Sequence, residues 1–233
     1  MKRYLPFAII ALVLCSAIVV AALLIKRAPK QTTSLSSTTS SGSSSSSGSK
    51  PGSPQLGANP PRSKGDPNAP VTIEEFGDLQ CPPCALMEPE LQKLEKEYGQ
   101  RLRVVFRHFP LTQMHPYALE AAMAAEAAGE QGKFWEMHDW MYSEQQNWSS
   151  APNARQLFMQ QAQNMGLDMD RFRQDMNSAE VKQRIIQDYN RGMSLGVQGT
   201  PTLFINGRMV KSEEMNDEGI HALINSSLAA KGQ

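Results

Sequence analysis

The sequence is poor in the residues on which several classes of small protein depend. It has only three cysteines among 233 residues, and one of them, Cys15, lies in an apolar N-terminal stretch. A scaffold held together by several disulfides is therefore excluded, because one pair at most remains for the folded part. Charge of one sign is also lacking, since 23 Lys and Arg balance 23 Asp and Glu. We expect no nucleic acid partner, because such binding needs a broad basic surface.

Histidine is scarce as well, which bears on metal and cofactor sites. The four histidines are scattered through the chain, and none has a spacing that pairs it with the remaining cysteines. A structural zinc site needs about four ligands. We therefore expect no metal and no cofactor, and interpret His115 as a capping residue near the start of a helical region.

The N-terminus predicts a membrane anchor. Residues 5–25 are apolar over about 21 residues, and as a helix they would span roughly 32 Å, against about 30 Å for the hydrocarbon core of a bilayer. A cleaved signal peptide usually has a shorter apolar region and a small-residue cleavage site. A retained single-pass anchor over residues 1–27 is favoured, and cleavage is the alternative. Basic residues flank both ends, so the positive-inside rule does not orient the segment.

Residues 28–63 predict a flexible linker. They are dominated by Ser, with Thr, Gly and Pro, and cannot bury enough apolar surface to fold. As a coil, this linker would reach roughly 34 Å, which lets a folded part sweep the nearby membrane surface. The remaining residues, 64–233, are within the size of one domain.

The first half of this domain predicts a strand–helix–strand unit. Residues 71–76 and 102–107 are rich in β-branched and apolar residues, as strands are. Residues 82–98 have helical spacing of leucines and end at Gly99, with Pro89 expected to kink the helix. A unit of this length favours parallel pairing of its strands, the start of an α/β fold.

The second half predicts helices followed by a hairpin. Residues from about 112 to 197 carry several helical patterns separated by turn signals, which indicate an inserted all-helical subdomain. Asn206-Gly207 then separates two apolar runs, a strong signal for an antiparallel hairpin. Residues 216–229 predict a closing helix with one apolar stripe.

The chemistry of the chain centres on the run Cys81-Pro82-Pro83-Cys84, at the junction of the first strand and its helix. At a helix N-terminus, unpaired N–H groups and the helix dipole favour an anion. Cys81 is therefore the expected nucleophile, and Cys84, one turn further, is expected to resolve a mixed disulfide. A fall of the Cys81 pKa from about 8.5 to about 7 needs roughly 2 kcal/mol of thiolate stabilisation.

The sequence resembles the DsbA-like thioredoxin family, bacterial thiol–disulfide oxidoreductases with a helical domain inserted in a thioredoxin fold. The likeness runs from about residue 66 to residue 228. It is carried by VTIEEF at 71–76, CPPC at 81–84, FRHFPL at 106–111, HPYA at 115–118, GKFW at 132–135 and GTPTLFING at 199–207.

This resemblance implies three further site features. Pro201 should follow a cis peptide bond beside the cysteines, leaving main-chain groups of Thr200 free to pair with an extended substrate; a trans strand start is the alternative. Glu75 should be a buried acid that handles the proton of Cys84; an exposed strand glutamate is the alternative.

The dipeptide Pro82-Pro83 departs from the family's strongly oxidising members, which have a histidine at the position of Pro83. Proline supplies neither a side-chain donor nor a backbone N–H. We therefore predict that Cys81 is less acidic here, and its disulfide less oxidising, than in those members. A Cys81 pKa below about 4 would contradict this.

Three functions remain open on the sequence. The leading one is an enzyme that exchanges disulfides with protein substrates in the periplasm or another extracytoplasmic space, where disulfides persist. A quinone-linked or thiol-redox membrane partner would recycle it. The second is a dedicated reductase, for example in cytochrome maturation, and the third is a tethered peptide-binding module with a structural disulfide.

Overall fold

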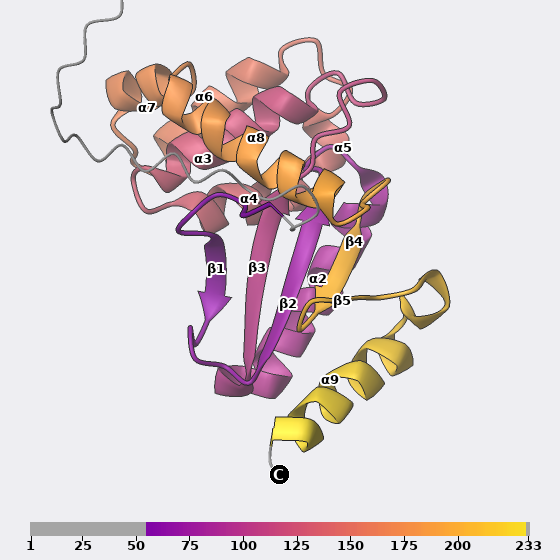
Figure 1. Cartoon of the computed structure of the whole chain (residues 1–233). Coiled ribbons are helices and arrows are strands. Elements are labelled where there is room, and N and C mark those ends of the chain that lie inside the picture. Colours follow the sequence, from indigo (N-terminus) through magenta and orange to yellow (C-terminus); the bar gives the residue numbers. More distant parts are fainter. Residues whose placement is uncertain (1–54, 232–233) are drawn as a thin grey trace, which may run out of the picture. The chain divides into compact units, whose positions relative to one another are not determined.

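The computed structural model describes residues 55–231 (Figure 1). The predicted anchor and most of the predicted linker lie outside these residues. Within the described part of the chain, no helix is both long and apolar enough to cross a membrane.

A five-stranded mixed sheet forms the centre of the fold, in the order β1-β3-β2-β4-β5. The predicted parallel pair is present as β2 (Val71–Gly77) and β3 (Leu102–His108). The predicted hairpin is present as β4 (Thr202–Ile205) and β5 (Arg208–Met209), and β4 pairs antiparallel with β2. At the hairpin turn, Asn206 and Gly207 have φ values of 49° and 81°, a conformation that suits these two residue types.

Strand β1 (Arg62–Gly65) was not predicted, because its sequence is polar and lacks alternation. It pairs antiparallel with β3 through main-chain bonds, which do not depend on side-chain type. The residues before it are also packed: Ala58 is 1% exposed, and its N–H donates to Asp188 at 2.8 Å. Structure therefore begins before residue 64, and the last residues of the predicted linker are part of the fold.

Two helices cover one face of the sheet. They are α2 (Pro82–Tyr98), which continues through Pro89 and is followed by the short 3-10 helix η1 (Gly99–Arg101), and α9 (Asp217–Lys231), which follows η2 (Ser212–Glu214). Apolar side chains of both helices join those of the strands in one cluster that includes Ile73, Leu91 and Ile224. Because strand residues alternate between faces, Glu75 points to the same face as Ile73, towards α2.

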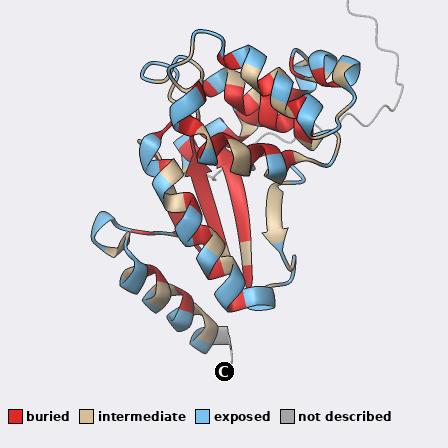
Figure 2. Cartoon of the chain, turned by 180° about the vertical axis from the view of Figure 1, so that it is seen from behind, coloured by how far each residue is buried: buried red, intermediate tan, exposed pale blue. Residues whose placement is uncertain are grey.

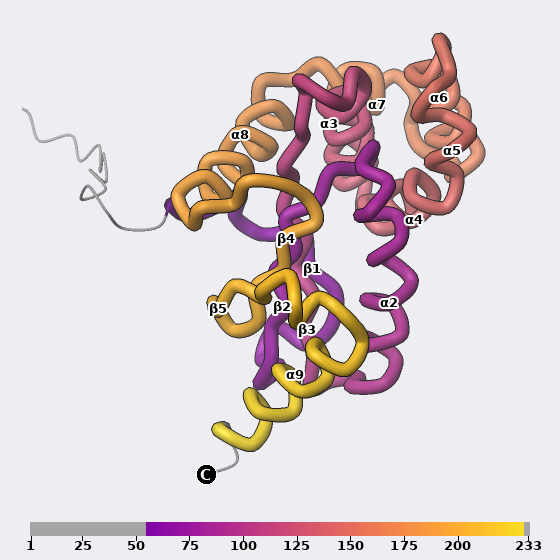
Figure 3. Tube along the Cα trace, turned by 90° about the vertical axis from the view of Figure 1, so that its right-hand side faces the viewer, coloured from indigo at the N-terminus to yellow at the C-terminus, as the bar shows by residue number. Residues whose placement is uncertain are grey.

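Six helices stand between β3 and β4, in the region where the insertion was predicted. They are α3 (Ala118–Gly129), α4 (Phe134–Ser143), α5 (Gln145–Trp148), α6 (Ala154–Asn164), α7 (Met169–Asp175) and α8 (Ala179–Ser194). Helix α8 lies on the opposite side of the sheet from α2 (Figure 3), and Ser178 caps it by accepting from Val181 N–H at 3.1 Å.

The interior of the insertion is continuous with the surroundings of the cysteines. Figure 2 shows buried residues running from the sheet into the helices above it. One apolar cluster contains Cys81, Cys84 and Phe106 together with Met141 and Trp148 of the insertion. The helical subdomain therefore forms one wall of the candidate site.

Candidate active site

Cys81 is the N-cap residue of α2, as the sequence predicted. It has extended backbone angles (φ −76°, ψ 120°), and Pro82 and Pro83 occupy the first helical positions. Proline is well tolerated there, because those N–H groups would have no helical partner. The Cys81 thiol thus lies at the positive end of the α2 dipole, where the backbone N–H of Cys84 is the main-chain donor that favours its anionic form, and Cys84 lies one turn further in.

The two thiols have unequal surroundings. Both are free thiols; Cys81 is 4% exposed and Cys84 is fully buried. A hydrogen bond from Cys84 lowers the pKa of Cys81 from 9.0 to about 6, although burial opposes this change. Burial raises the pKa of Cys84 well above 9.0, and its hydrogen bond to Cys81 acts in the same direction. At neutral pH, Cys81 therefore holds the negative charge and Cys84 holds the proton.

Glu75 is not an exposed strand glutamate. Its side chain is 1% exposed, and no hydrogen bond reaches its Oε1 from the described residues. Burial raises its pKa well above 4.5; the charges of Glu88 and Cys81 add to this, and Lys64 opposes it. A buried carboxyl with a raised pKa beside a buried thiol is typical of groups that exchange protons in active sites.

The Thr200–Pro201 peptide bond is cis, as the resemblance implied. The carbonyl oxygen of Thr200 lies 3.3 Å from Cys81 Sγ, which places this loop directly beside the thiol. An open hollow of about 360 Å³ adjoins the loop. It is lined by Pro83, Leu86, Met87, Pro201, Ser212 and Met215.

The loop before Cys81 is held by residues that the sequence did not single out. Buried Asp78 accepts from the backbone N–H of Gln80 at 2.8 Å and of Leu111 at 2.9 Å, and from His115 Nδ1 at 2.7 Å. His115 does not cap a helix as its position predicts: Tyr117 is the N-cap residue of α3, and His115 contacts this aspartate. The available signal was Gly77-Asp78 after a strand, since aspartate often bonds the backbone two residues later.

A charged cluster lies beyond Glu75. Lys64 of β1 places its Nζ 3.7 Å from Glu88, 3.8 Å from Glu95 and 3.4 Å from Asp139. No sequence pattern indicates this role, because Lys64 follows the Ser-rich stretch directly. Lys64 is thus a cation shared by the carboxylates of Glu88, Glu95 and Asp139.

The same cluster bears on metal binding. Among the described residues, ligand atoms of Glu88, His138 and Asp139 lie within 4.8 Å of one another. The ammonium of Lys64, however, already faces Glu88 and Asp139. A metal ion would have to displace this cation, so the donor set does not favour a metal centre.

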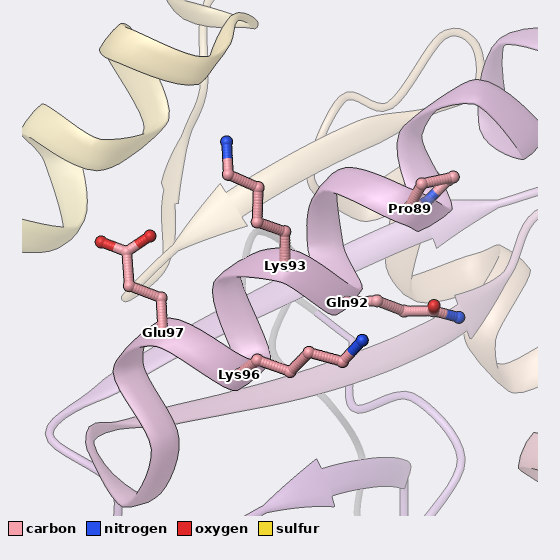
Figure 4. A pocket seen from close by; sticks show the side chains of 5 residues that line it. All are labelled: Pro89, Gln92, Lys93, Lys96 and Glu97. Carbon is pink, nitrogen blue, oxygen red and sulfur yellow. The ribbon is translucent and has the colours of Figure 1, made fainter.

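A second hollow, of about 560 Å³, lies along α2 (Figure 4). It is lined by Pro89, Gln92, Lys93, Lys96 and Glu97. None of these side chains carries a thiol. The chemistry of the chain therefore lies at the N-terminus of α2 rather than here.

Comparison with known proteins agrees with this geometry. A family model described as thioredoxin matches residues 58–226. The Na(+)/H(+) antiporter NhaA 3 of Salinispora tropica is 41% identical over 167 residues, which are 72% of this chain but 24% of the antiporter. This chain spans about a quarter of the length of the curated relatives it matches.

Solved structures show the same likeness. A thioredoxin-like oxidoreductase from Silicibacter pomeroyi has 26% identity and a TM-score of 0.62, covering 72% of this chain and 92% of its own. DsbA2 of Pseudomonas aeruginosa has 26% identity and a TM-score of 0.55, covering 70% of this chain and 91% of its own.

Proposed function

This chain belongs to the thioredoxin family, among its DsbA-like thiol–disulfide oxidoreductases, and from that premise we propose that it exchanges disulfides with protein substrates through Cys81 and Cys84. The observation that carries the proposal is the unequal pair of thiols, with the pKa of Cys81 lowered to about 6 at a helix N-terminus and that of Cys84 raised.

The exchange proceeds in two steps. In the oxidising direction, a substrate thiolate attacks the Cys81 sulfur of the Cys81–Cys84 disulfide, forming a mixed disulfide and releasing Cys84 as a thiol. A second substrate thiolate then attacks the substrate's own sulfur, and Cys81 leaves as a thiolate. Two electrons pass from the substrate to the enzyme, and the low pKa of Cys81 makes it a good leaving group.

Glu75 exchanges the proton of Cys84 in this scheme. The charge of Glu75 raises the pKa of Cys84, and the Oε1 of Glu75 has no hydrogen-bond partner among the described residues. Cys84 is fully buried, so no solvent molecule has direct access to its sulfur. A carboxylate that takes up this proton makes Cys84 the attacking thiolate in the reducing direction.

Main-chain groups of Thr200 hold an extended segment of the substrate beside Cys81, in the manner of an added strand. The adjoining hollow is lined mainly by apolar side chains, among them Leu86, which is 78% exposed. The substrate class is therefore a partly unfolded polypeptide with a cysteine next to apolar residues.

The compartment and the recycling partner follow from the chemistry. Disulfides persist outside the cytoplasm, so the domain acts in the periplasm or another extracytoplasmic space, tethered by the anchor that residues 1–27 predict. The tether keeps the domain within reach of a membrane partner, quinone-linked or thiol-redox, that restores its redox state.

Replacing the resolving cysteine tests the exchange. We expect Cys84→Ser to accumulate covalent complexes with cellular proteins, because the mixed disulfide at Cys81 can no longer be released from within. The complexes are counted on non-reducing gels, where reductant should dissolve them. Cys81→Ser is the matched control and should form none. If Cys84→Ser gives no complexes, the cysteines are structural and the chain is a peptide-binding module.

Equilibration with glutathione decides the direction of electron flow. A strong oxidant has a potential near about −120 mV and a thioredoxin-like reductant near about −270 mV. Because the Cys81 pKa of about 6 lies between those of these two classes, we expect an intermediate potential. A value at the lower end would favour the dedicated reductase over the oxidase.

A further inference from the structure

The side chain of Gln145 reaches the active-site loop from the insertion. Gln145 is the first residue of α5 and is 5% exposed. Its Nε2 donates to two main-chain oxygens, that of Leu79 at 2.8 Å and that of Cys81 at 3.0 Å. Both hydrogens of the amide are thus directed at the loop that carries Cys81.

The element that presents Gln145 is firmly anchored. Trp148, at the end of α5, is fully buried, and its indole N–H donates to the Met141 carbonyl at 2.7 Å. Its ring packs edge-on against Phe158, with 5.0 Å between centroids. A side chain on such an element keeps its donors in place with little loss of entropy.

The carbonyl of Cys81 belongs to the residue whose sulfur reacts. It also accepts from the backbone N–H of Cys84 at 3.1 Å and of Ala85 at 3.3 Å. A carbonyl oxygen carries partial negative charge, which repels a nearby thiolate unless donors offset it. Gln145 supplies two such donors, one to this oxygen and one to the Leu79 oxygen.

We propose that Gln145 is a positioning residue, which favours the anionic form of Cys81 by neutralising the carbonyls of Leu79 and Cys81. The inference rests on the proposed function and deepens it. Under this proposal, the insertion helps to set the redox potential of the Cys81–Cys84 pair, in addition to forming one wall of the site.

Gln80 provides a matched control. It is 6% exposed and also ties the loop to the insertion, because its Nε2 donates to Ser149 O at 2.8 Å and its Oε1 accepts from Tyr117 N–H at 2.7 Å. Its side chain makes no hydrogen bond to Cys81. A purely structural tie would therefore be lost equally in variants of either glutamine.

The experiment compares Gln145→Met and Gln145→Glu with Gln80→Met in the full chain. The rate of iodoacetamide alkylation of Cys81, followed on its own peptide across pH, gives its pKa. Equilibration with glutathione gives the redox constant. Because half a pKa unit corresponds to about threefold, we expect Gln145→Met to make the disulfide about threefold less oxidising. Gln145→Glu should have a larger effect, because it replaces donors by an acceptor.

Three results would overturn the inference. The first is that both Gln145 variants keep the Cys81 pKa and the glutathione constant within measurement error. The second is that Gln80→Met shifts both quantities as far as Gln145→Met. The third is that both Gln145 variants fail to fold while Gln80→Met folds, which would assign Gln145 to the fold alone. The alkylation readout needs no catalysis, so a failure of the proposed function would be seen separately.

Discussion

At the scale of single residues, Glu75 combines burial with the absence of a hydrogen bond to one of its oxygens among the described residues. Its pKa is raised well above 4.5, chiefly by burial. Only the ionised Glu75 carboxylate can accept the proton of Cys84. The rate at which Cys84 releases a mixed disulfide should therefore increase as pH rises through the raised pKa of Glu75. We expect Glu75→Gln to slow that release about tenfold and to flatten its pH profile, measured with a glutathione mixed disulfide at Cys81.

The same Glu75→Gln substitution that slows the release of the mixed disulfide should make the folded protein more stable. A carboxyl whose pKa is raised by folding opposes folding increasingly as pH rises above its unfolded pKa. Glu75→Gln should therefore raise the melting temperature at neutral pH, and raise it more at higher pH. Glu74→Gln is the control: this residue accepts from Arg107 at 2.8 Å and points to the other face. If Glu74→Gln flattened the profile equally, Glu75 would have no special part in proton transfer.

At the scale of elements, the sequence predicted those helices and strands that a local residue pattern determines. Runs rich in β-branched and apolar residues located β2 and β3, leucine spacing located α2, and Asn206-Gly207 located the hairpin. Strand β1 was missed because its sequence is polar and it pairs with β3 mainly through the main chain, with Arg62 opposite Phe106. Its place is decided by β3, 40 residues later, which no local pattern shows.

The residues of the candidate site fall into the same two groups, those in short local motifs and those that reach the site only through the fold. Cys81, Cys84, Thr200 and Pro201 belong to short motifs, so the sequence found them and the structure brings them together. Gln145 reaches Cys81 across 64 residues of sequence, and its neighbours have no spacing that distinguishes it from other helix glutamines. Contacts of this kind arise only when the insertion folds back on the sheet.

At the scale of the whole molecule, Arg107 joins three separate parts of the described chain. From β3, its Nε donates to Glu74 of β2 at 2.8 Å, and its Nη1 donates to Asp188 of α8 at 2.8 Å and to the Ala58 carbonyl at 2.7 Å. Arg107 is 8% exposed, and both acids are buried with it. Arg107 therefore links the sheet to the insertion and to the segment before β1.

Removing this cation should loosen all three parts together. Arg107→Met keeps most of the side chain's volume but leaves buried Asp188 without its guanidinium partner, so we expect the free energy of unfolding to fall by about 3 kcal/mol, measured by denaturant titration. Arg103→Met is the control on the same strand; Arg103 makes one side-chain bond, to Ser63 at 3.2 Å, and its loss should cost less than about 1 kcal/mol. Proteolysis should also begin earlier between residues 55 and 61 in Arg107→Met, since the Ala58 carbonyl loses its donor. Equal losses in the two variants would mean that the segment before β1 is held by its strand pairing rather than by the shared arginine.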